Sequence, residues 1–231
     1  MSSAPTSSHA TSSHATSSGT ASRLHADAVA VLTSWAAPDA EQDRLRTSYL
    51  DHLRRHPDGV YRSCLPAHLT ASALVVDAGG QRVLLALHRK GGFWGQLGGH
   101  CETGDQTLEA AALREATEES GIAGLRVVGG PVPIDLDRHR LSGAFGSCGE
   151  HLDVRYLLEA PAGAEPVTSD ESDDVRWFGW DALPAGAVED LERLLRRAQR
   201  VLAAGTSDQT SQPSSASVPS SSPAAAATPS R

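Results

Sequence analysis

Three carboxylates stand close together near the middle of this 231-residue chain, in the segment REATEESGI that starts at Arg114. Glu115, Glu118 and Glu119 are related as i, i+3 and i+4, so a helix would place all three on one face. Like charges on one face repel one another, and a bound divalent cation would remove that repulsion. Carboxylate oxygens are hard ligands that suit Mg²⁺ or Mn²⁺, so the pattern predicts a site for one of these ions.

A glycine-rich loop leads into this acidic segment. It reads GGHCETGDQT from Gly98 to Thr107, and Gly121 follows the last glutamates as a helix stop. The whole stretch resembles the Nudix box of the Nudix hydrolases, in which a glycine and a loop acid precede Arg-Glu-x-x-Glu-Glu-x-Gly. A solvated acidic helix of no special function would not explain why these features occur together at these offsets.

The first half of the box departs from the family pattern in two ways. Asp105 stands where the family usually has Glu, and one extra residue lies between Gly104 and Arg114. An insertion inside the helix would rotate the glutamates away from their common face. We therefore expect the extra residue to lengthen the loop ahead of the helix, near residues 105–107.

The resemblance implies a fold and a reaction. The fold is α/β, a Nudix-type α/β/α sandwich with a mixed sheet, here with additional N-terminal helices. The reaction is cleavage of a diphosphate linkage in a small-molecule substrate, a nucleoside diphosphate derivative, with Mg²⁺ or Mn²⁺ as cofactor. In this family the cation neutralises the diphosphate and lowers the pKa of a coordinated water.

The resemblance also implies which residues bind the metal. Glu115, Glu118 and Glu119 are the expected ligands, together with the carbonyl group of Gly99. In some members an acidic residue of a later loop reaches the metal, and Glu171 is the candidate here. Several aspartates surround Glu171, so an exposed acidic loop explains this residue equally well.

One of the box glutamates should act as the general base. Glu115 is our first choice, and Glu118 is counted with it among the catalytic residues. Arg114 joins this group as a supporting residue, because its guanidinium should hold a box carboxylate through a charged hydrogen bond.

Residues before the box are candidates for substrate binding. Arg89 and Lys90 stand where a phosphate could be met, although an exposed basic pair is an equally good explanation. Trp94 lies among glycines and could form a wall of the substrate site, whereas Trp177 lies in an apolar strand and should belong to the core.

The acidic residues of the box loop allow two interpretations. Glu102 and Asp105 could join a second metal site, or they could cap the start of the helix. We favour capping by Asp105, although Thr107 is also a suitable N-cap residue.

Cysteine and histidine residues near the box do not have the short paired spacings of structural zinc sites. We therefore expect them to be core or rim residues; they are His100, Cys101, His139, Cys148 and His151.

Two other functions remain open for a chain of this kind. Isopentenyl diphosphate isomerases share the Nudix fold and use a Cys-Gly-His sequence in a similar loop, but Gly98, Gly99 and His100 here lack that cysteine. A nucleotide-metabolite sensor without turnover is the other alternative. Such sensors usually lose box acids, and this chain keeps all three.

The elements that must position the box follow from hydrophobic patterns. Apolar stripes predict helices over residues 25–56 with a break at Pro38, covering one flank of the core or serving as a lid or dimer arm. Apolar runs predict a hairpin of strands 69–77 and 82–88, a short strand at 93–97, and a closing helix over 189–202. Further strands are expected at 125–128, 134–136, 151–159 and 175–180.

The same patterns predict four parts of the chain. Residues 1–23 and 204–231 are rich in Ser, Ala, Thr and Pro and should be disordered tails. Residues 24–65 form an N-terminal helical segment, and residues 66–203 form the Nudix hydrolase domain.

Composition excludes several classes of protein. The net charge is −8 with no basic cluster, which argues against general nucleic-acid binding. Three cysteines are too few for a disulfide framework and indicate a reducing compartment. The sequence has neither a membrane-spanning run nor a secretory signal. We expect a cytoplasmic protein that is a monomer or a homodimer.

Overall fold

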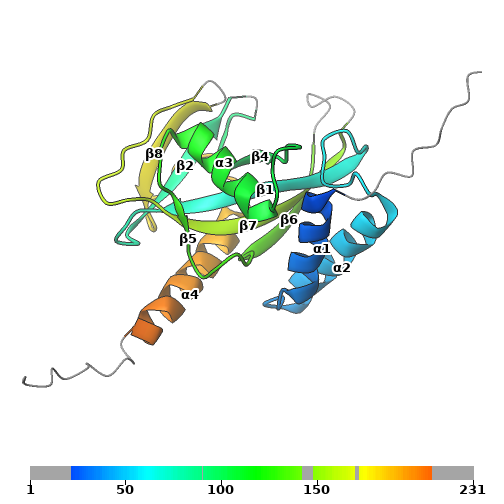
Figure 1. The fold of residues 1–231 in the computed structure, drawn as a ribbon. Coiled ribbons are helices and arrows are strands. Elements are labelled where there is room, and N and C mark those ends of the chain that lie inside the picture. The colour runs from blue at the N-terminus through cyan, green and yellow to red at the C-terminus, as the bar shows by residue number, and fades with distance from the viewer. Residues whose placement is uncertain (1–21, 90, 142–147, 170–171, 210–231) are drawn as a thin grey trace, which may run out of the picture.

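The computed structural model describes residues 22–89, 91–141, 148–169 and 172–209 (Figure 1). Both predicted tails therefore lie almost wholly outside the described residues. The helices are α1 Arg23–Ser34, α2 Ala40–Arg55, α3 Leu108–Ser120 and α4 Leu191–Gln209. The strands are β1 Ala67–Val76, β2 Arg82–His88, β3 Phe93–Gly95, β4 Leu97–His100, β5 Arg126–Val127, β6 Asp135–Arg140, β7 Glu150–Glu159 and β8 Ser172–Gly179.

The strands form one mixed sheet built around β1. Along its whole length β1 pairs in parallel with β7, so that Ala67 faces Glu150 and Val76 faces Glu159. Its other edge is shared by two antiparallel strands, with β4 beside its first half and β2 beside its end. The sheet continues outward through β3 and β8 on the β2 side, and through β5 and β6 on the β7 side.

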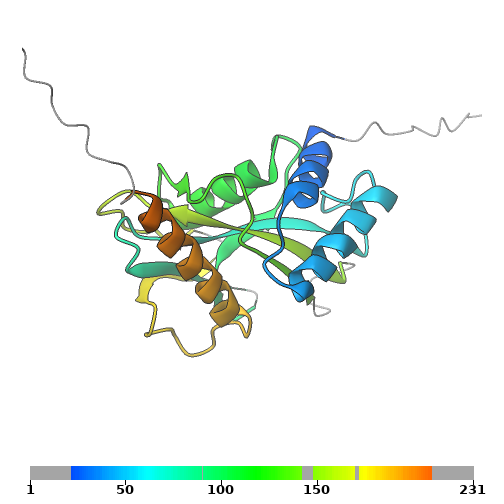
Figure 2. The same ribbon diagram turned by 90° about the horizontal axis from the view of Figure 1, so that it is seen from below.

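Helices cover both faces of the sheet, as Figures 1 and 2 show. On one face α3 packs with α1 and α2 over a core that includes Leu69, Ala71 and Tyr156. On the other face α4 packs over a second core that includes Leu74, Val83 and Leu157. Side chains alternate between the faces along β1, which explains why the near-continuous apolar run of this strand is buried on both sides. The predicted α/β/α sandwich with a mixed sheet is confirmed.

Most predicted elements are present, with some differences in length. The break at Pro38 separates α1 from α2, as expected. The helix α4 is longer than predicted: it runs past Leu202 and Gly205 to Gln209, into the segment that we assigned to a disordered tail. Ala203 and Ala204 before Gly205 favour the helix, and a single glycine costs only about 1 kcal/mol there.

The N-terminal helices are part of the main core, as expected of helices that cover its flank. Leu24, Leu32 and Leu53 are buried in the same apolar cluster as the inner side chains of α3. Polar contacts add to this packing. The Tyr49 hydroxyl of α2 donates to the carbonyl oxygen of Asp137 at 2.5 Å.

Gln42 fixes α2 against the sheet edge. Its side-chain amide donates to the Leu136 carbonyl at 2.9 Å and accepts from the Leu136 amide at 2.7 Å. Gln42 is fully buried, so water cannot replace either bond.

We expect Gln42→Leu to lower the free energy of unfolding by about 2 to 3 kcal/mol, because two buried backbone groups would lose their partners. Urea denaturation would measure this change. Gln81→Leu is the matched control, since Gln81 is exposed and should cost less than about 0.5 kcal/mol. Equal costs for the two substitutions would show that the Gln42 bonds do not hold α2 in place.

A network of buried charges joins the sheet to α4. Arg155 on β7 is only 2% exposed and pairs with Asp153, Asp135 and Asp137 at 2.9, 3.4 and 3.2 Å, and also with Asp190. Burial acts to lower the pKa of Arg155, but these carboxylates outweigh burial and raise it. From α4, Arg193 adds a second guanidinium to the same aspartates. Arg197 donates to Asp39, the N-cap of α2.

In the described part of the chain, no helix is both long enough and apolar enough to cross a membrane.

Candidate active site

The acidic helix α3 begins and ends at defined caps. The Thr107 hydroxyl accepts from the Ala110 amide at 3.0 Å, which makes Thr107 the N-cap residue. A carboxylate oxygen of Asp27, on α1, accepts from the Leu108 amide at 2.9 Å. Gly121 ends the helix in the left-handed conformation, with φ of 67°. The extra residue of the box thus lies in the loop, and the helical register of the glutamates is intact.

The prediction that Asp105 caps this helix is wrong. Its carboxylate turns instead to the Glu102 amide, at 2.7 Å, and to the guanidinium of Arg114. The extra residue before the helix makes Thr107 the N-cap, so Asp105 lies two positions before the cap. The buried Asp105 carboxylate is paired with the guanidinium of Arg114.

Arg114 holds the loop and the helix together. Its Nε and Nη2 bind the two oxygens of Asp105 at 3.2 and 3.0 Å, and Nη2 also donates to the His100 carbonyl. Its Nη1 donates to Glu115 and Glu118, both at 3.0 Å. The bonds to Asp105 are the main cause that raises the pKa of Arg114, and Glu115 adds to them. The expected charged hydrogen bond from Arg114 to a box carboxylate is therefore present, and the contact with Asp105 involves both of its oxygens.

Two of the three glutamates are packed against the glycine pair of β4. Glu119 is 3% exposed, and its Oε2 accepts from the Gly98 amide at 2.9 Å. Glu115 lies against Gly99 so closely that a Cβ atom there would be 2.7 Å from its carboxylate. Gly98 has φ of 152°, and a Cβ there would clash with Ser72 on β1. Gly99 thus lets the Glu115 carboxylate approach the backbone, and Gly98 lets β4 lie close to β1.

These residues suit a hard divalent cation. Glu115, Glu118 and Glu119 offer carboxylate oxygens from one helix face, beside the backbone of Gly99. The Glu118 side chain is 60% exposed, so a cation can reach this face of the helix from solvent. Within the described residues, these carboxylates do not form a group whose ligand atoms all lie within 4.8 Å of one another. Glu115 and Glu118 are both bonded to Arg114, and Glu119 is bonded to the Gly98 amide.

A family model named NUDIX domain matches residues 66–198, more than half of the chain. The chain belongs to the Nudix family. It belongs to the enzyme class of the Nudix hydrolases, which are pyrophosphohydrolases. Among curated proteins, none matches this chain.

Solved structures of Nudix hydrolases resemble this one. A hydrolase of the NUDIX family from Clostridium perfringens is 24% identical, with 59% of this chain and 97% of that chain covered and a TM-score of 0.48. An Ap4A hydrolase from C. elegans is 19% identical, with 59% and 98% covered and a TM-score of 0.48. A MutT NUDIX hydrolase from Burkholderia pseudomallei is 27% identical, with 57% and 97% covered and a TM-score of 0.45.

Two of the predicted substrate residues of this Nudix protein, Arg89 and Trp94, have the following surroundings. Arg89 is exposed at the end of β2 and bonds to Asp173 at 2.9 Å. Trp94 is half-buried and packs against Phe178 within the core that faces α4. Lys90 and Glu171 lie outside the described residues. The substrate-binding roles of Arg89, Lys90 and Trp94 stay predictions, as does metal binding by Glu171.

The other residues singled out near the Nudix box have different surroundings. Cys101 is buried in the core under α3, and burial raises the pKa of its thiol to about 12. A buried thiol held in its neutral form is a poor nucleophile. Trp177 is half-buried, packs against the α3-side core and donates to the Ala164 carbonyl. Sequence reasoning missed Asp27, whose bond to Leu108 has no local sequence signal.

The contact between Gly99 and Glu115 predicts a specific defect. We expect Gly99→Ala to fold, because the clash falls on the end of a flexible side chain, and to lower turnover about a hundredfold by displacing the Glu115 carboxylate. Gly104→Ala is the matched control, since its added methyl group would meet open space in the same loop. Steady-state kinetics would compare the two variants. A Gly99→Ala enzyme as active as Gly104→Ala would contradict a role for this contact.

Proposed function

We propose that this Nudix protein is a Mg²⁺- or Mn²⁺-dependent hydrolase that cleaves the diphosphate linkage of a nucleoside diphosphate derivative. The observation that carries the proposal is the face of α3, where Glu115, Glu118 and Glu119 stand beside the Gly98–Gly99 backbone. An anionic substrate needs positive charge at this acidic face. A bound divalent cation supplies that charge and activates a water molecule.

In this proposal the three glutamates and the Gly99 carbonyl hold the cation. Glu115 takes the proton of the attacking water, because it is the glutamate that lies against the Gly99 backbone of β4. Glu118 is the second candidate for this role. Arg114 keeps Glu115 and Glu118 in position through its two Nη1 bonds and ties them to the loop through Asp105. Its part in catalysis is therefore to position the carboxylates.

The proposal includes contacts with the substrate. Arg89 could meet a phosphate group if its bond to Asp173 were exchanged for one to the substrate, and Lys90 follows it in the chain. Trp94 would need to expose a face of its half-buried ring. We also propose a cytoplasmic enzyme, monomeric or homodimeric, that acts on small molecules. The three cysteines, which all lie in the described residues, are free, which suits a reducing compartment.

A phosphate-release assay over a panel of nucleoside diphosphate derivatives tests the proposal. Products are followed with and without Mg²⁺, and again with Mn²⁺. Cleavage of at least one compound that stops when EDTA removes the metal is the expected result. Tight nucleotide binding without turnover of any compound would instead indicate a sensor protein.

A further inference from the structure

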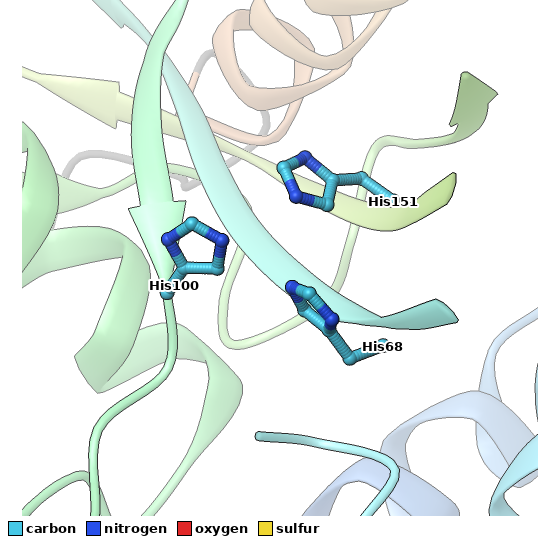
Figure 3. Close-up of side chains that lie close together, drawn as sticks. All are labelled: His68, His100 and His151. Carbon is cyan, nitrogen blue, oxygen red and sulfur yellow. The ribbon is translucent and has the colours of Figure 1, made fainter. Parts of the chain in front are cut away.

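Three histidines meet where β1, β4 and β7 lie side by side. His68 on β1 faces His151 on β7 in the parallel pair, and His100 on β4 is opposite Thr70, two residues further along β1. Residues two apart on a strand point to the same face of the sheet. The three imidazole rings therefore gather on one face, as Figure 3 shows.

The rings are close enough to share one ligand. Neighbouring ring centroids are 5.0 to 5.1 Å apart. One nitrogen from each ring lies within 4.8 Å of the others. Three imidazoles bound to one Zn²⁺ at about 2.1 Å would have nitrogens about 3.4 Å apart, so modest side-chain rotations would complete such a site.

The hydrogen bond that His68 makes through Nδ1 leaves Nε2 for a metal ion. Its Nδ1 lies 3.2 Å from the Cys64 carbonyl oxygen, which can only accept, and the tautomer that donates to this oxygen has its lone pair on Nε2. A backbone carbonyl on the other ring nitrogen is the usual support of a metal-binding histidine. Burial is the main cause that lowers the pKa of His68 and of His151.

We propose that His68, His100 and His151 form a second metal site that binds Zn²⁺ or a similar transition-metal ion. Imidazole nitrogen suits these ions and not Mg²⁺, which prefers oxygen. Three protein ligands leave one coordination position open for water or a substrate oxygen. His68 is fully buried, whereas His100 and His151 are partly exposed, so an ion can enter from their side.

This site is distinct from the carboxylates of α3 and does not depend on the proposed hydrolysis. It is nonetheless next to them, because His100 follows Gly99 and its carbonyl oxygen accepts from Arg114. It also revises our expectation that the histidines near the box are core or rim residues. That expectation considered His100 and His151 without His68, the residue that brings them together.

A neighbouring histidine provides a matched control. His139 pairs with His151 across β6 and β7, and their ring centroids are 5.3 Å apart. Its Nδ1 bonds to Asp137 at 3.1 Å, and His139 is not one of the three clustered ligands. Substituting His139 thus removes an imidazole from the same surface without removing a proposed ligand.

Zn²⁺ binding to the full chain tests the site. The parent carries His9→Gln and His14→Gln, because these histidines of the N-terminal segment could bind the ion by themselves. Metal-free protein is titrated with Zn²⁺ in competition with a chromophoric chelator, and Co²⁺ serves as a spectroscopic probe of coordination. We expect one tightly bound ion per chain.

His100→Gln and His151→Gln should each weaken Zn²⁺ binding about a hundredfold or more. His139→Gln should leave it within about threefold of the parent. Circular dichroism of the metal-free proteins verifies that each variant is folded, and the two ligand variants serve as independent tests. Glu119→Gln should lose its response to Mg²⁺ and keep its affinity for Zn²⁺, which separates this site from the box.

Three results would overturn the assignment. The first is a parent protein that binds no stoichiometric Zn²⁺. The second is equal affinity in the parent and in folded His100→Gln and His151→Gln. The third is an equal loss in His139→Gln or in Glu119→Gln, because neither residue is a proposed ligand.

Discussion

Replacing Glu119 by Gln is expected to lower turnover about a thousandfold or more while the fold stays intact. Gln has the same length, and its amide oxygen can still accept the hydrogen bond from the Gly98 amide. The substitution removes one negative charge from the proposed cation site, so the attacking water and the diphosphate would lose their common anchor. Steady-state kinetics with saturating Mg²⁺ would measure the loss.

The same substitution should change the response to Mg²⁺ in a thermal melt. A cation that binds only the folded state raises the melting temperature of the parent by mass action. Without metal, Glu119→Gln should be no less stable than the parent, because a repulsion between neighbouring carboxylates is relieved. Its Mg²⁺-induced shift should be much smaller. Glu118→Gln should behave in the same way but more mildly, since Glu118 is exposed.

Glu192→Gln is the control for this experiment. Glu192 is exposed on α4, far from the box in sequence, and pairs with Arg196 at i, i+4. It should keep both the activity and the Mg²⁺ shift of the parent. If the parent, Glu119→Gln and Glu192→Gln all showed equal Mg²⁺ shifts, the box glutamates would not bind the cation, and the proposed function would lose its physical basis.

The largest loss of stability is expected from Arg155→Met. Arg155 is surrounded by four aspartates, of which Asp135 and Asp153 are almost completely buried. Methionine fills a similar space but leaves these charges without their main partner. Breaking a buried ion pair from one side costs about 3 to 5 kcal/mol, a large part of the stability of a typical domain. The free energy of unfolding in urea would measure the cost.

Arg126→Met provides the comparison at the surface. Arg126 is mostly exposed and pairs with Glu159 at 2.9 Å, so its loss should cost less than about 1 kcal/mol. The contrast between the two substitutions isolates the effect of burial, since both remove one arginine from an ion pair. A cost for Arg155→Met as small as that for Arg126→Met would mean that Arg193 and Arg197 satisfy the aspartates without Arg155.

The acidic face of the site could be predicted because its geometry is local. Three glutamates within five positions share a helix face whatever the rest of the chain does. The glycine pair was recognised for the same reason, since it directly precedes the box. The strands were predicted because burial on both faces leaves long apolar runs in β1 and β7.

Features that depend on strand register could not be predicted. His68, His100 and His151 are far apart in sequence, and only the pairing of β1 with β4 and β7 unites them. Arg155 reads in the sequence as one polar residue of a strand, although it is the centre of a buried ion network. The role of Asp105 was misjudged because capping is a local rule, whereas the bond to Arg114 spans the loop and two helical turns.

The bond between Asp27 and Leu108 lies across the boundary of the segment that matches the Nudix family. The segment shared with the Nudix family begins at residue 66, yet the first amide of the acidic helix is bound by a side chain that lies before it. The same N-terminal helices bury apolar residues of the shared core. The segment that matches the family is therefore smaller than the unit that packs together in this protein. A fragment that starts at residue 66 would contain every box residue and would still lack the side chain that binds the first amide of the acidic helix.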